Sequence, residues 1–276
     1  MSPGAATAPR VALLGICYDG SSSFLRGAAA APPIIRQALW SEAGNPWTEL
    51  GIDLSAAALD DEGDLVPAEA DDPAAVRQAI EAAVKGIAGS GRRPLLLGGD
   101  HSITYPILRG FRPTHPRLGI LHFDAHVDLW DEFEGDRYSH ACPFARIMEE
   151  GLADRLVQVG IRTMNGHQRE QARRFGVEVI EMKDWREGTR FDFDTPVYVS
   201  FDLDAIEPGL APGISHREAG GLTVRQALGM VQSLGAPLVG ADFVEFNPAA
   251  DRSGVTAAVS AKLVKELAGR MLLEAR

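Results

Sequence analysis

The chain has 276 residues, of which 45% are hydrophobic and 24% charged, an ordinary composition for a globular protein with a substantial buried core. Its 27 basic and 38 acidic side chains leave a formal net charge of -11, which argues against nucleic acid as a partner because nucleic-acid-binding proteins present a basic face. No apolar run approaches the ~20 residues that a helix needs to cross a bilayer, so we expect no membrane segment.

The two cysteines bear on the cellular compartment. Cys17 and Cys142 lie far apart and form no CxxC or ligand-spaced group, so we expect no disulfide framework. This usage suits a reducing compartment. Residues 1–10 lack a basic segment followed by an apolar one, which is the pattern of a signal peptide. A cytoplasmic location is therefore the expectation.

Short β-rich runs alternate with helical stretches along almost the whole chain. The predicted strands lie at residues 11–17, 94–97, 118–123, 156–159, 177–180, 197–201 and 238–244. The predicted helices lie at residues 33–39, 73–88, 142–150, 166–175, 224–234 and 255–273. Pro73 at a first helical position and Thr223 as an N-cap mark two helix starts. Several strands are nearly continuous hydrophobic runs, as expected of parallel strands that are covered on both faces.

Strand–helix alternation of this kind predicts a three-layer α/β/α fold with a mostly parallel central sheet. No linker, low-complexity tract or internal repeat divides the chain, so we expect residues 1–276 to form a single domain. The pattern is weakest at residues 41–72, where Gly, Pro and acidic residues indicate loops with room for one short strand.

The most informative segment follows the predicted strand at 118–123. Asp124, His126 and Asp128 occupy every second position there, and alternation along a strand would point all three side chains the same way. They also lie at the carboxyl end of the strand, where open α/β sheets place their ligand sites.

Two further strands end in a similar way. The strand at 197–201 runs into Asp202 and Asp204. The strand at 94–97 ends in two glycines that let the backbone turn sharply, and His101 follows shortly after them. Three strand ends thus direct four carboxylates and two imidazoles toward one place.

This collection of side chains predicts bound metal. Without a cation, four neighbouring carboxylates would repel one another, and protonation would have to remove their charge. Mixed Asp/His ligation without Cys suits Mn, Fe, Co, Ni or Zn better than Ca or a structural zinc site. Six ligands exceed what one such metal takes from a protein, whereas two metals that share bridging carboxylates fit, and a metal pair can acidify one water. Helix capping alone would explain one such strand end but not three.

At these residues the sequence resembles the ureohydrolase family, which comprises arginases, agmatinases and relatives that hydrolyse guanidino compounds with a manganese pair. The matching stretches are GGDHS (98–102), FDAHVD (123–128), SFDLD (200–204) and ADFVEFNP (241–248). Residues 133–151 and 211–225 resemble the plant-type arginases in particular. The resemblance implies an arginase/deacetylase-like α/β fold and a homo-oligomer, either a trimer or a hexamer.

The resemblance also implies two Mn²⁺ ions per chain, with Ni, Co or Fe as alternatives, and assigns their ligands position by position. One metal would be held by His101, Asp124, Asp128 and Asp202, and the other by His126, Asp124, Asp202 and Asp204. Asp124 and Asp202 would then bridge the two ions.

Three residues receive catalytic roles from the same resemblance. Asp128 would accept a hydrogen bond from the metal-bridging hydroxide, His140 matches the family's proton-shuttling histidine, and Glu245 matches the carboxylate that holds the guanidinium. The chemistry agrees, because a carboxylate pairs with a planar guanidinium through two parallel hydrogen bonds. A histidine can likewise protonate a leaving amine near neutral pH.

The other histidines have plainer interpretations. His122 shares the predicted strand face of Asp124 one step deeper, so we expect it in the core or behind the metal ligands. His115 and His167 lie in polar or helical surroundings and are expected at the surface. His216 lies in a Gly- and Pro-rich loop, where it either lines the entrance of the site or is only a loop residue.

Several functions stay open on this basis. The first is hydrolysis of a small cationic guanidino substrate, with L-arginine giving L-ornithine and urea placed ahead of agmatine or another guanidino acid. Arg137, His216 and Arg217 are candidates to pair with the α-carboxylate of arginine. A single-metal deacetylase would share the architecture but lacks the paired DAHxD and DxD motifs. A non-enzymatic metal-binding protein would be favoured by a missing ligand, and none is missing.

Overall fold

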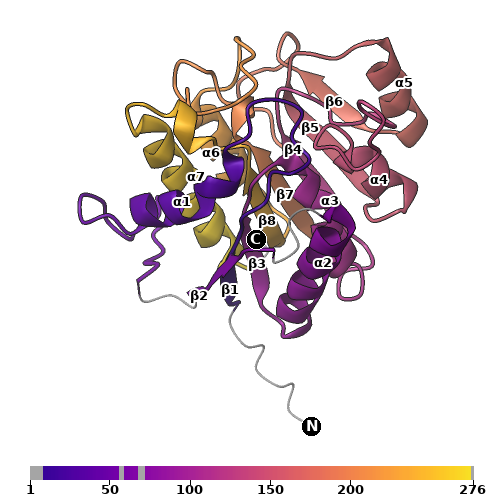
Figure 1. The fold of residues 1–276 in the computed structure, drawn as a ribbon. Helices are drawn as coiled ribbons and strands as arrows, with labels where there is room; N and C mark the ends of the chain where they lie inside the picture. The colour runs from indigo at the N-terminus through magenta and orange to yellow at the C-terminus, as the bar shows by residue number, and fades with distance from the viewer. Residues whose placement is uncertain (1–8, 56–58, 68–71, 275–276) are drawn as a thin grey trace.

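The computed structural model describes residues 9–55, 59–67 and 72–274, and these contain one eight-stranded sheet with helices on both faces (Figure 1). The strands are β1 (Val11–Ile16), β2 (Leu59–Leu65), β3 (Arg93–Leu97), β4 (Gly119–Phe123), β5 (Arg155–Ile161), β6 (Glu178–Glu181), β7 (Val197–Asp202) and β8 (Leu238–Val244). Their order is β2-β1-β3-β8-β7-β4-β5-β6, and each neighbouring pair is parallel. The prediction of a mostly parallel sheet is confirmed.

The helices divide between the two faces of the sheet (Figure 1). One face carries α1 (Ala31–Leu39), α6 (Val224–Gln232) and α7 (Val255–Met271). The other face carries α2 (Pro73–Gly89), α3 (Thr104–Phe111), α4 (Pro143–Glu149) and α5 (Gly166–Phe175). This arrangement confirms the predicted three-layer α/β/α class. Among the described helices, none has the length and apolar character needed to span a membrane.

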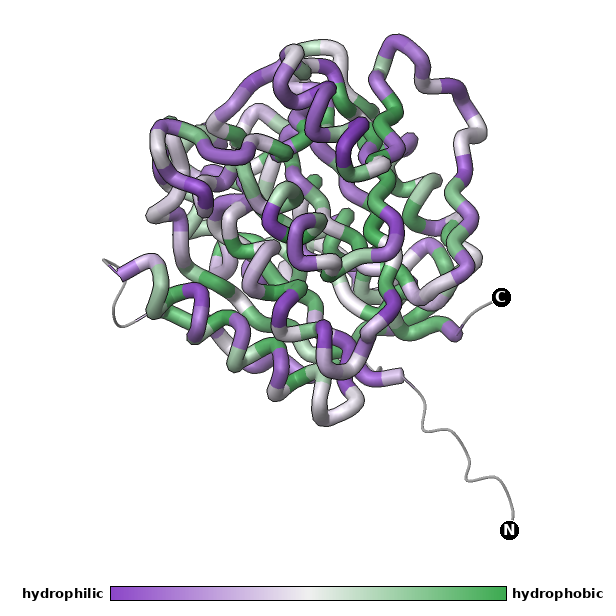
Figure 2. The backbone as a smooth tube through the Cα atoms, turned by 90° about the vertical axis from the view of Figure 1, so that its right-hand side faces the viewer, coloured by the Kyte–Doolittle hydropathy of each residue, from purple (hydrophilic) through white to green (hydrophobic). Residues whose placement is uncertain are grey.

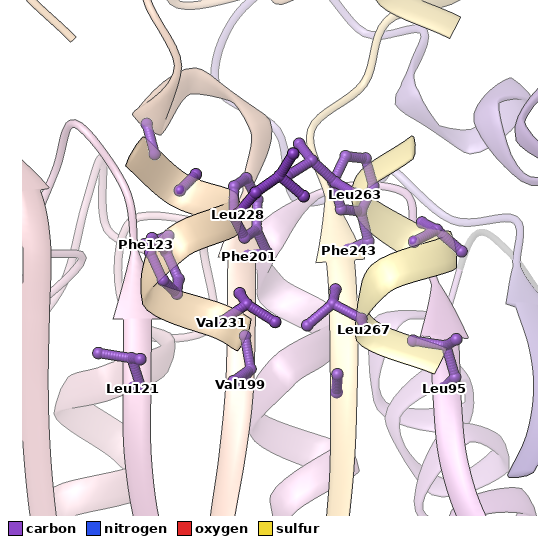
Figure 3. Packing of buried hydrophobic residues seen from close by; sticks show 14 of the residues in the cluster. Leu95, Leu121, Phe123, Val199, Phe201, Leu228, Val231, Phe243, Leu263 and Leu267 are labelled. Atoms are coloured by element: carbon purple, nitrogen blue, oxygen red, sulfur yellow. The ribbon is translucent and has the colours of Figure 1, made fainter. Parts of the chain in front are cut away.

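A hydrophobic core lies on each side of the sheet, because neighbouring residues of a strand face opposite ways. Beneath α6 and α7, Phe123, Phe201 and Phe243 of three adjacent strands form a row of stacked rings, covered by Leu228 and Leu263 (Figure 3). Burial of each such side chain stabilises the fold by about 1.5–3 kcal/mol. Figure 2 shows the same distribution along the backbone, with hydrophobic segments inside and hydrophilic loops outside.

The sequence pattern predicted no helix at α3, and the short strand for which residues 41–72 left room is β2. The strand β2 reads LDDEGDL and shows no hydrophobic run, because it lies at the edge of the sheet, where its acidic side chains pair with Arg10, Arg36 and Arg92. The helix α3 is short and contains Pro106. That proline lies in the first turn of the helix, where its missing N–H would have had no intrahelical partner.

The register of the four central strands brings their carboxyl ends to one level. Leu97 of β3 pairs with Phe243 of β8, Phe243 pairs with Phe201 of β7, and Phe201 pairs with Phe123 of β4. The residues that follow these four positions therefore emerge side by side at one edge of the sheet. All the strand-end motifs singled out in the sequence lie on these strands.

The turn after β3 requires a glycine at position 99. The carbonyl of Gly99 accepts a hydrogen bond from the N–H of Glu245, and a Cβ at Gly99 would lie 1.6 Å from the carbonyl oxygen of Tyr18. We expect Gly99→Ala to lower the free energy of unfolding by about 3 kcal/mol or more, because the backbone itself must shift.

The matched control is Gly86→Ala in the middle of α2, where a Cβ would meet no neighbour within 4 Å. This change should raise the free energy of unfolding by about 0.5–1 kcal/mol, since alanine loses less backbone entropy in a helix. Urea denaturation measures both variants, and equal stabilities would contradict the close approach at Gly99.

Candidate metal centre

The segment after β4 turns instead of continuing as a strand. β4 ends at Phe123, and Asp124 Oδ1 accepts a hydrogen bond from the backbone N–H of His126 (2.6 Å), which closes a tight turn. Asp128 follows with a positive φ of 46°. The prediction that strand alternation aligns these side chains is therefore wrong, because the chain bends to bring them together. Their predicted position at the carboxyl end of the strand is confirmed.

The ends of β7 and β3 are built from similar turns. Asp202 is the last residue of β7, and its Oδ1 accepts from the N–H of Asp204 (2.8 Å). Asp204 Oδ1 in turn accepts from the N–H of Ala125 (2.9 Å), which ties this turn to the one after β4. His101 begins a short 3-10 helix, His101–Ile103, just past the glycine turn.

His101 forms the centre of one half of the site. Its Nδ1 lies 3.2 Å from Asp124 Oδ2, 3.1 Å from Asp128 Oδ2 and 3.2 Å from Asp202 Oδ2. Three carboxylates that come from two different strand ends therefore converge on one imidazole nitrogen.

His126 forms the other half. Its Nδ1 lies 3.3 Å from Asp124 Oδ1 and 3.0 Å from Asp204 Oδ2. Ligand atoms of His126, Asp124 and Asp204 all lie within 4.8 Å of one another. The structure thus brings the six predicted ligands together as two imidazole–carboxylate groups, and Asp124 contributes one oxygen to each group.

Burial makes the negative charge of this cluster costly. His101 and Asp124 are inaccessible to solvent, and Asp202 and Asp204 are each only 3% exposed. Burial and the neighbouring carboxylates raise the pKa of Asp202 well above its usual range, as expected where acids repel one another. His101 Nδ1 makes no hydrogen bond with the described residues. A buried imidazole nitrogen without a hydrogen bond, surrounded by carboxylates, is the donor set that a divalent cation binds, and the two groups together fit a pair of such cations.

His122 supports Asp124 from behind. On β4, its Nε2 lies 2.9 Å from Asp124 Oδ2, and its Nδ1 lies 3.0 Å from the amide nitrogen of Gln158 on β5. Since that amide donates, His122 accepts at Nδ1 and donates its own N–H to Asp124. Burial opposes ionisation of Asp124, but His122 and His101 hold the pKa of Asp124 well below its usual range. The predicted place of His122 behind the ligands is confirmed.

The site opens into a cavity of about 140 Å³, which has room for a small ligand only. The apolar part of the wall includes Trp130 and Phe133, whose ring centroids lie 5.5 Å apart. Gln168 of α5 and Ser23 of the loop after β1 also line the cavity, and the sequence analysis missed both. Ser23 lies in no recognisable motif, and the capping box formed by Asn165 and Gln168 marks only the start of α5, so neither signal indicates a place in the cavity.

His140 and Glu245 meet at this cavity. His140 Nδ1 lies 3.0 Å from Glu245 Oε1, which also accepts from the backbone N–H of His101 (2.9 Å). His140 Nε2 faces Ser23, whose hydroxyl lies 2.8 Å away. Burial lowers the pKa of His140, but the Glu245 carboxylate outweighs it and raises that pKa to about 9. Glu245 Oε2 accepts no hydrogen bond from the described residues.

His216 lines the cavity as well, with its ring centroid 5.3 Å from that of His140 and 5.9 Å from that of His126. Of the two positions considered for His216, the structure shows the one at the entrance. Arg137 instead pairs with two acidic neighbours, and Arg217 lines a different cavity.

Two histidines lie away from this centre. His167 is exposed, as predicted, and its ring stacks on Trp130 with centroids 5.2 Å apart. His115 is partly buried rather than exposed, because its ring packs 5.5 Å from that of Phe111.

Two imidazole–carboxylate groups, a buried Glu–His pair and a small cavity at the carboxyl edge of a parallel sheet define a candidate binuclear metallohydrolase. Comparison with known proteins leads to the same class. A model of the arginase family matches residues 9–269.

Individual relatives agree with that match. The chain is 45% identical to Arginase 1, mitochondrial, of Arabidopsis thaliana, over 94% of this chain and 80% of that protein. It is 37% identical to guanidinopropionase of Pseudomonas aeruginosa, over 94% of this chain and 85% of that protein. The solved structure of arginase from Medicago truncatula matches with a TM-score of 0.91 at 44% identity, covering 96% of this chain and 88% of that one.

The chain belongs to the arginase family. The predicted resemblance, the predicted fold and the prediction of a metal-dependent ureohydrolase are confirmed. Membership in this family implies a binuclear site for divalent metals, which the donor groups described above fit.

The charge of the site predicts the effect of metal removal. After loading with Mn²⁺, elemental analysis should find two ions per chain. Chelation should abolish activity and lower the Tm, because the buried carboxylates regain their mutual repulsion and lose ligands that bind only the folded state. One ion per chain in a fully active sample would refute the two-metal site, and an unchanged Tm would refute the electrostatic argument.

Proposed function

We propose that this chain hydrolyses the guanidinium group of L-arginine and releases L-ornithine and urea, using two Mn²⁺ ions. The observation that carries the proposal is the pair of imidazole–carboxylate groups that share Asp124, placed beside Glu245 at a small cavity. Identity of 44–45% to proteins named arginase, over 94% of this chain, supports arginine as the substrate.

The proposed ligands extend the two groups, because Asp202, which faces His101, is assigned to the second ion as well. One ion would be held by His101, Asp124, Asp128 and Asp202, and the other by His126, Asp124, Asp202 and Asp204. When bound, such a pair supplies a nucleophile at neutral pH by lowering the pKa of a water molecule. Asp128 lines the cavity and would accept a hydrogen bond from the attacking water. The nitrogen and oxygen donors suit Mn²⁺, and they would also suit Ni, Co or Fe.

Glu245 would hold the substrate through its free oxygen. Oε1 already accepts from His140 and from the N–H of His101, so Oε2 is the atom left for a guanidinium N–H. The contact with His101 also fixes the carboxylate next to the metal ligands. A guanidinium held there is oriented before the reaction begins, which lowers the entropic part of the barrier.

His140 would supply the proton that the leaving amine needs. Its ring is held at both nitrogens, by Glu245 at Nδ1 and by Ser23 at Nε2, so its orientation toward the cavity is fixed. A protonated histidine that faces a carboxylate and a hydroxyl can give a proton to the substrate and regain one from solvent.

The amino-acid end of arginine requires a polar partner away from the metals. Gln168 is 7% exposed and lines the cavity, and its carbonyl oxygen accepts from the N–H of Asn165. Its amide nitrogen donates no hydrogen bond to the described residues. Gln168 and His216 would therefore receive the α-carboxylate, in place of Arg137 and Arg217.

Other substrates have support from two relatives. The 37% identity to a guanidinopropionase favours hydrolysis of other guanidino acids by the same mechanism, and a solved agmatinase-like structure at 32% identity favours agmatine. A single-metal deacetylase and a non-enzymatic metal-binding protein lack such support, because the six donors form two groups beside a Glu–His pair.

Assembly and location complete the proposal. A homo-oligomer, trimer or hexamer, rests on the family resemblance, and size-exclusion chromatography with light scattering would test it. A cytoplasmic location is supported by two free cysteines, Cys17 and Cys142, although several plant relatives are named mitochondrial.

Substitutions at His140 and Glu245 separate proton transfer from binding. His140→Asn should lower kcat by ~100- to 10,000-fold with little change in KM, because it removes the acid without removing the guanidinium contact. Glu245→Gln should impair both kcat and KM, since it removes the charged partner. Ser23→Ala, which removes only the hydroxyl contact to His140 Nε2, is the control and should have a smaller effect. Wild-type rates in either main variant would show a wrong assignment.

The substrate panel tests the proposal as a whole. We expect kcat/KM for arginine to exceed that for agmatine, guanidinobutyrate and guanidine under identical Mn²⁺ loading. Agmatine and guanidine lack the carboxylate that a polar site selects, and the shorter chain of guanidinobutyrate places its carboxylate closer to the guanidinium than arginine does. Gln168→Ala should lower kcat/KM for arginine more than for agmatine. A kcat/KM for agmatine or guanidinobutyrate that is tenfold higher than that for arginine would contradict arginine as the substrate. It would not contradict the hydrolysis of guanidino compounds.

A further inference from the structure

Asp242 of β8 is a wholly buried carboxylate that no step of the proposed hydrolysis uses. Its Oδ2 accepts hydrogen bonds from the hydroxyls of Tyr198 (2.8 Å) and Thr104 (3.0 Å), and its Oδ1 accepts from the hydroxyl of Ser200 (2.7 Å). Ser200 Oγ also lies 3.0 Å from Nε2 of His101. A single hydroxyl therefore connects this carboxylate to an imidazole of the candidate metal centre.

The number of available protons fixes the direction of these hydrogen bonds. A serine hydroxyl has one proton, and Ser200 donates it to Asp242. Ser200 Oγ must then accept at its contact with His101, so the N–H of the neutral ring is at Nε2. That leaves the lone pair at Nδ1, the atom that faces Asp124, Asp128 and Asp202.

We infer that Asp242 is a positioning residue for the metal centre: acting through Ser200, it fixes the tautomer and ring orientation of His101 so that Nδ1 is presented to a divalent cation. This inference rests on the proposed ligand role of His101. Carboxylates that hold a ligating histidine from behind tune metal affinity in proteins generally, and losing one weakens binding about 10- to 100-fold. Here a hydroxyl stands between the carboxylate and the ring.

Burial makes the Asp242–Ser200–His101 path hard to replace. All three side chains have no solvent exposure, so water cannot take the place of a lost partner. The hydroxyls of Tyr198 and Thr104 compensate the buried charge of Asp242 and hold the carboxylate in one orientation. They lie off the path to His101, which makes Tyr198 the natural control position.

The test measures the Kd for Mn²⁺ by titration calorimetry on the full chain after chelation, together with the urea stability of the metal-free protein. Ser200→Ala, which breaks the path, and Asp242→Asn, which keeps its shape but removes the charge, should each weaken Mn²⁺ binding by about 10- to 100-fold. Tyr198→Phe removes a hydrogen bond to the same carboxylate, so it should lower stability and keep an affinity close to wild type.

His101→Asn separates this inference from the ligand assignment. Wild-type affinity in Ser200→Ala and Asp242→Asn, with weak binding in His101→Asn, would overturn the path alone. Unchanged affinity in all three variants would overturn the ligand role of His101 as well. An equal loss of affinity in Tyr198→Phe would also overturn the inference, because it would show general loosening of the core around β7 and β8.

Discussion

Repulsion among buried carboxylates is the constraint on which the site depends. Asp124, Asp128, Asp202 and Asp204 are each at most 7% exposed and surround two imidazoles, so solvent does little to screen the charges of these carboxylates. Protons or cations relieve this repulsion by removing or balancing the negative charge. The fold maintains the cluster because four adjacent parallel strands end at one level, and because hydrophobic cores on both faces of the sheet hold those ends in place.

Hydrogen bonds from the backbone fix the orientation of the carboxylates. Oδ1 of Asp124 and Oδ1 of Asp202 each accept from a backbone N–H of their own turn, and Oδ1 of Asp204 accepts from the N–H of Ala125 in the neighbouring turn. The Oδ2 atom of each of the three carboxylates faces an imidazole. Rotation of each group is thereby blocked before any ligand arrives, which is the preorganisation that a reactive site needs. Asp100 uses the same device outside the cluster: it accepts from the N–H groups of Ser21 and Ser102, and so ties the loop that carries Ser23 to the turn after β3.

The sequence predicted the sheet and the six clustered donors, because apolar runs ending in acids and histidines are a local pattern. The roles of His140 and Glu245 were predicted only from the family resemblance. No local sequence pattern indicates that the loop carrying His140 lies against the end of the strand that precedes Glu245. Ser200 lies within the SFDLD match and Gln168 within the capping box of α5, but neither pattern indicates the contact that matters, because His101 and the cavity lie far from them in the sequence. Strand alternation failed after Phe123 because a side-chain-to-backbone hydrogen bond bends the chain there.

Strain adds to the cost of the site and explains the polar shell around it. Asp128 and Glu245 both have positive φ angles, 46° and 65°, and such non-glycine conformations cost about 1–3 kcal/mol each. Movement of the carboxylates away from one another would relieve both the backbone strain and the repulsion. Without metal, the side chains therefore stay in this arrangement only if the surrounding groups prevent that movement. The pairs His122–Gln158 and Ser200–Asp242 supply that restraint from inside the sheet, where each buried polar group has a partner that it would lose by moving. Bound cations would then act on a centre already in its final shape, so that more of their binding free energy stabilises the folded state.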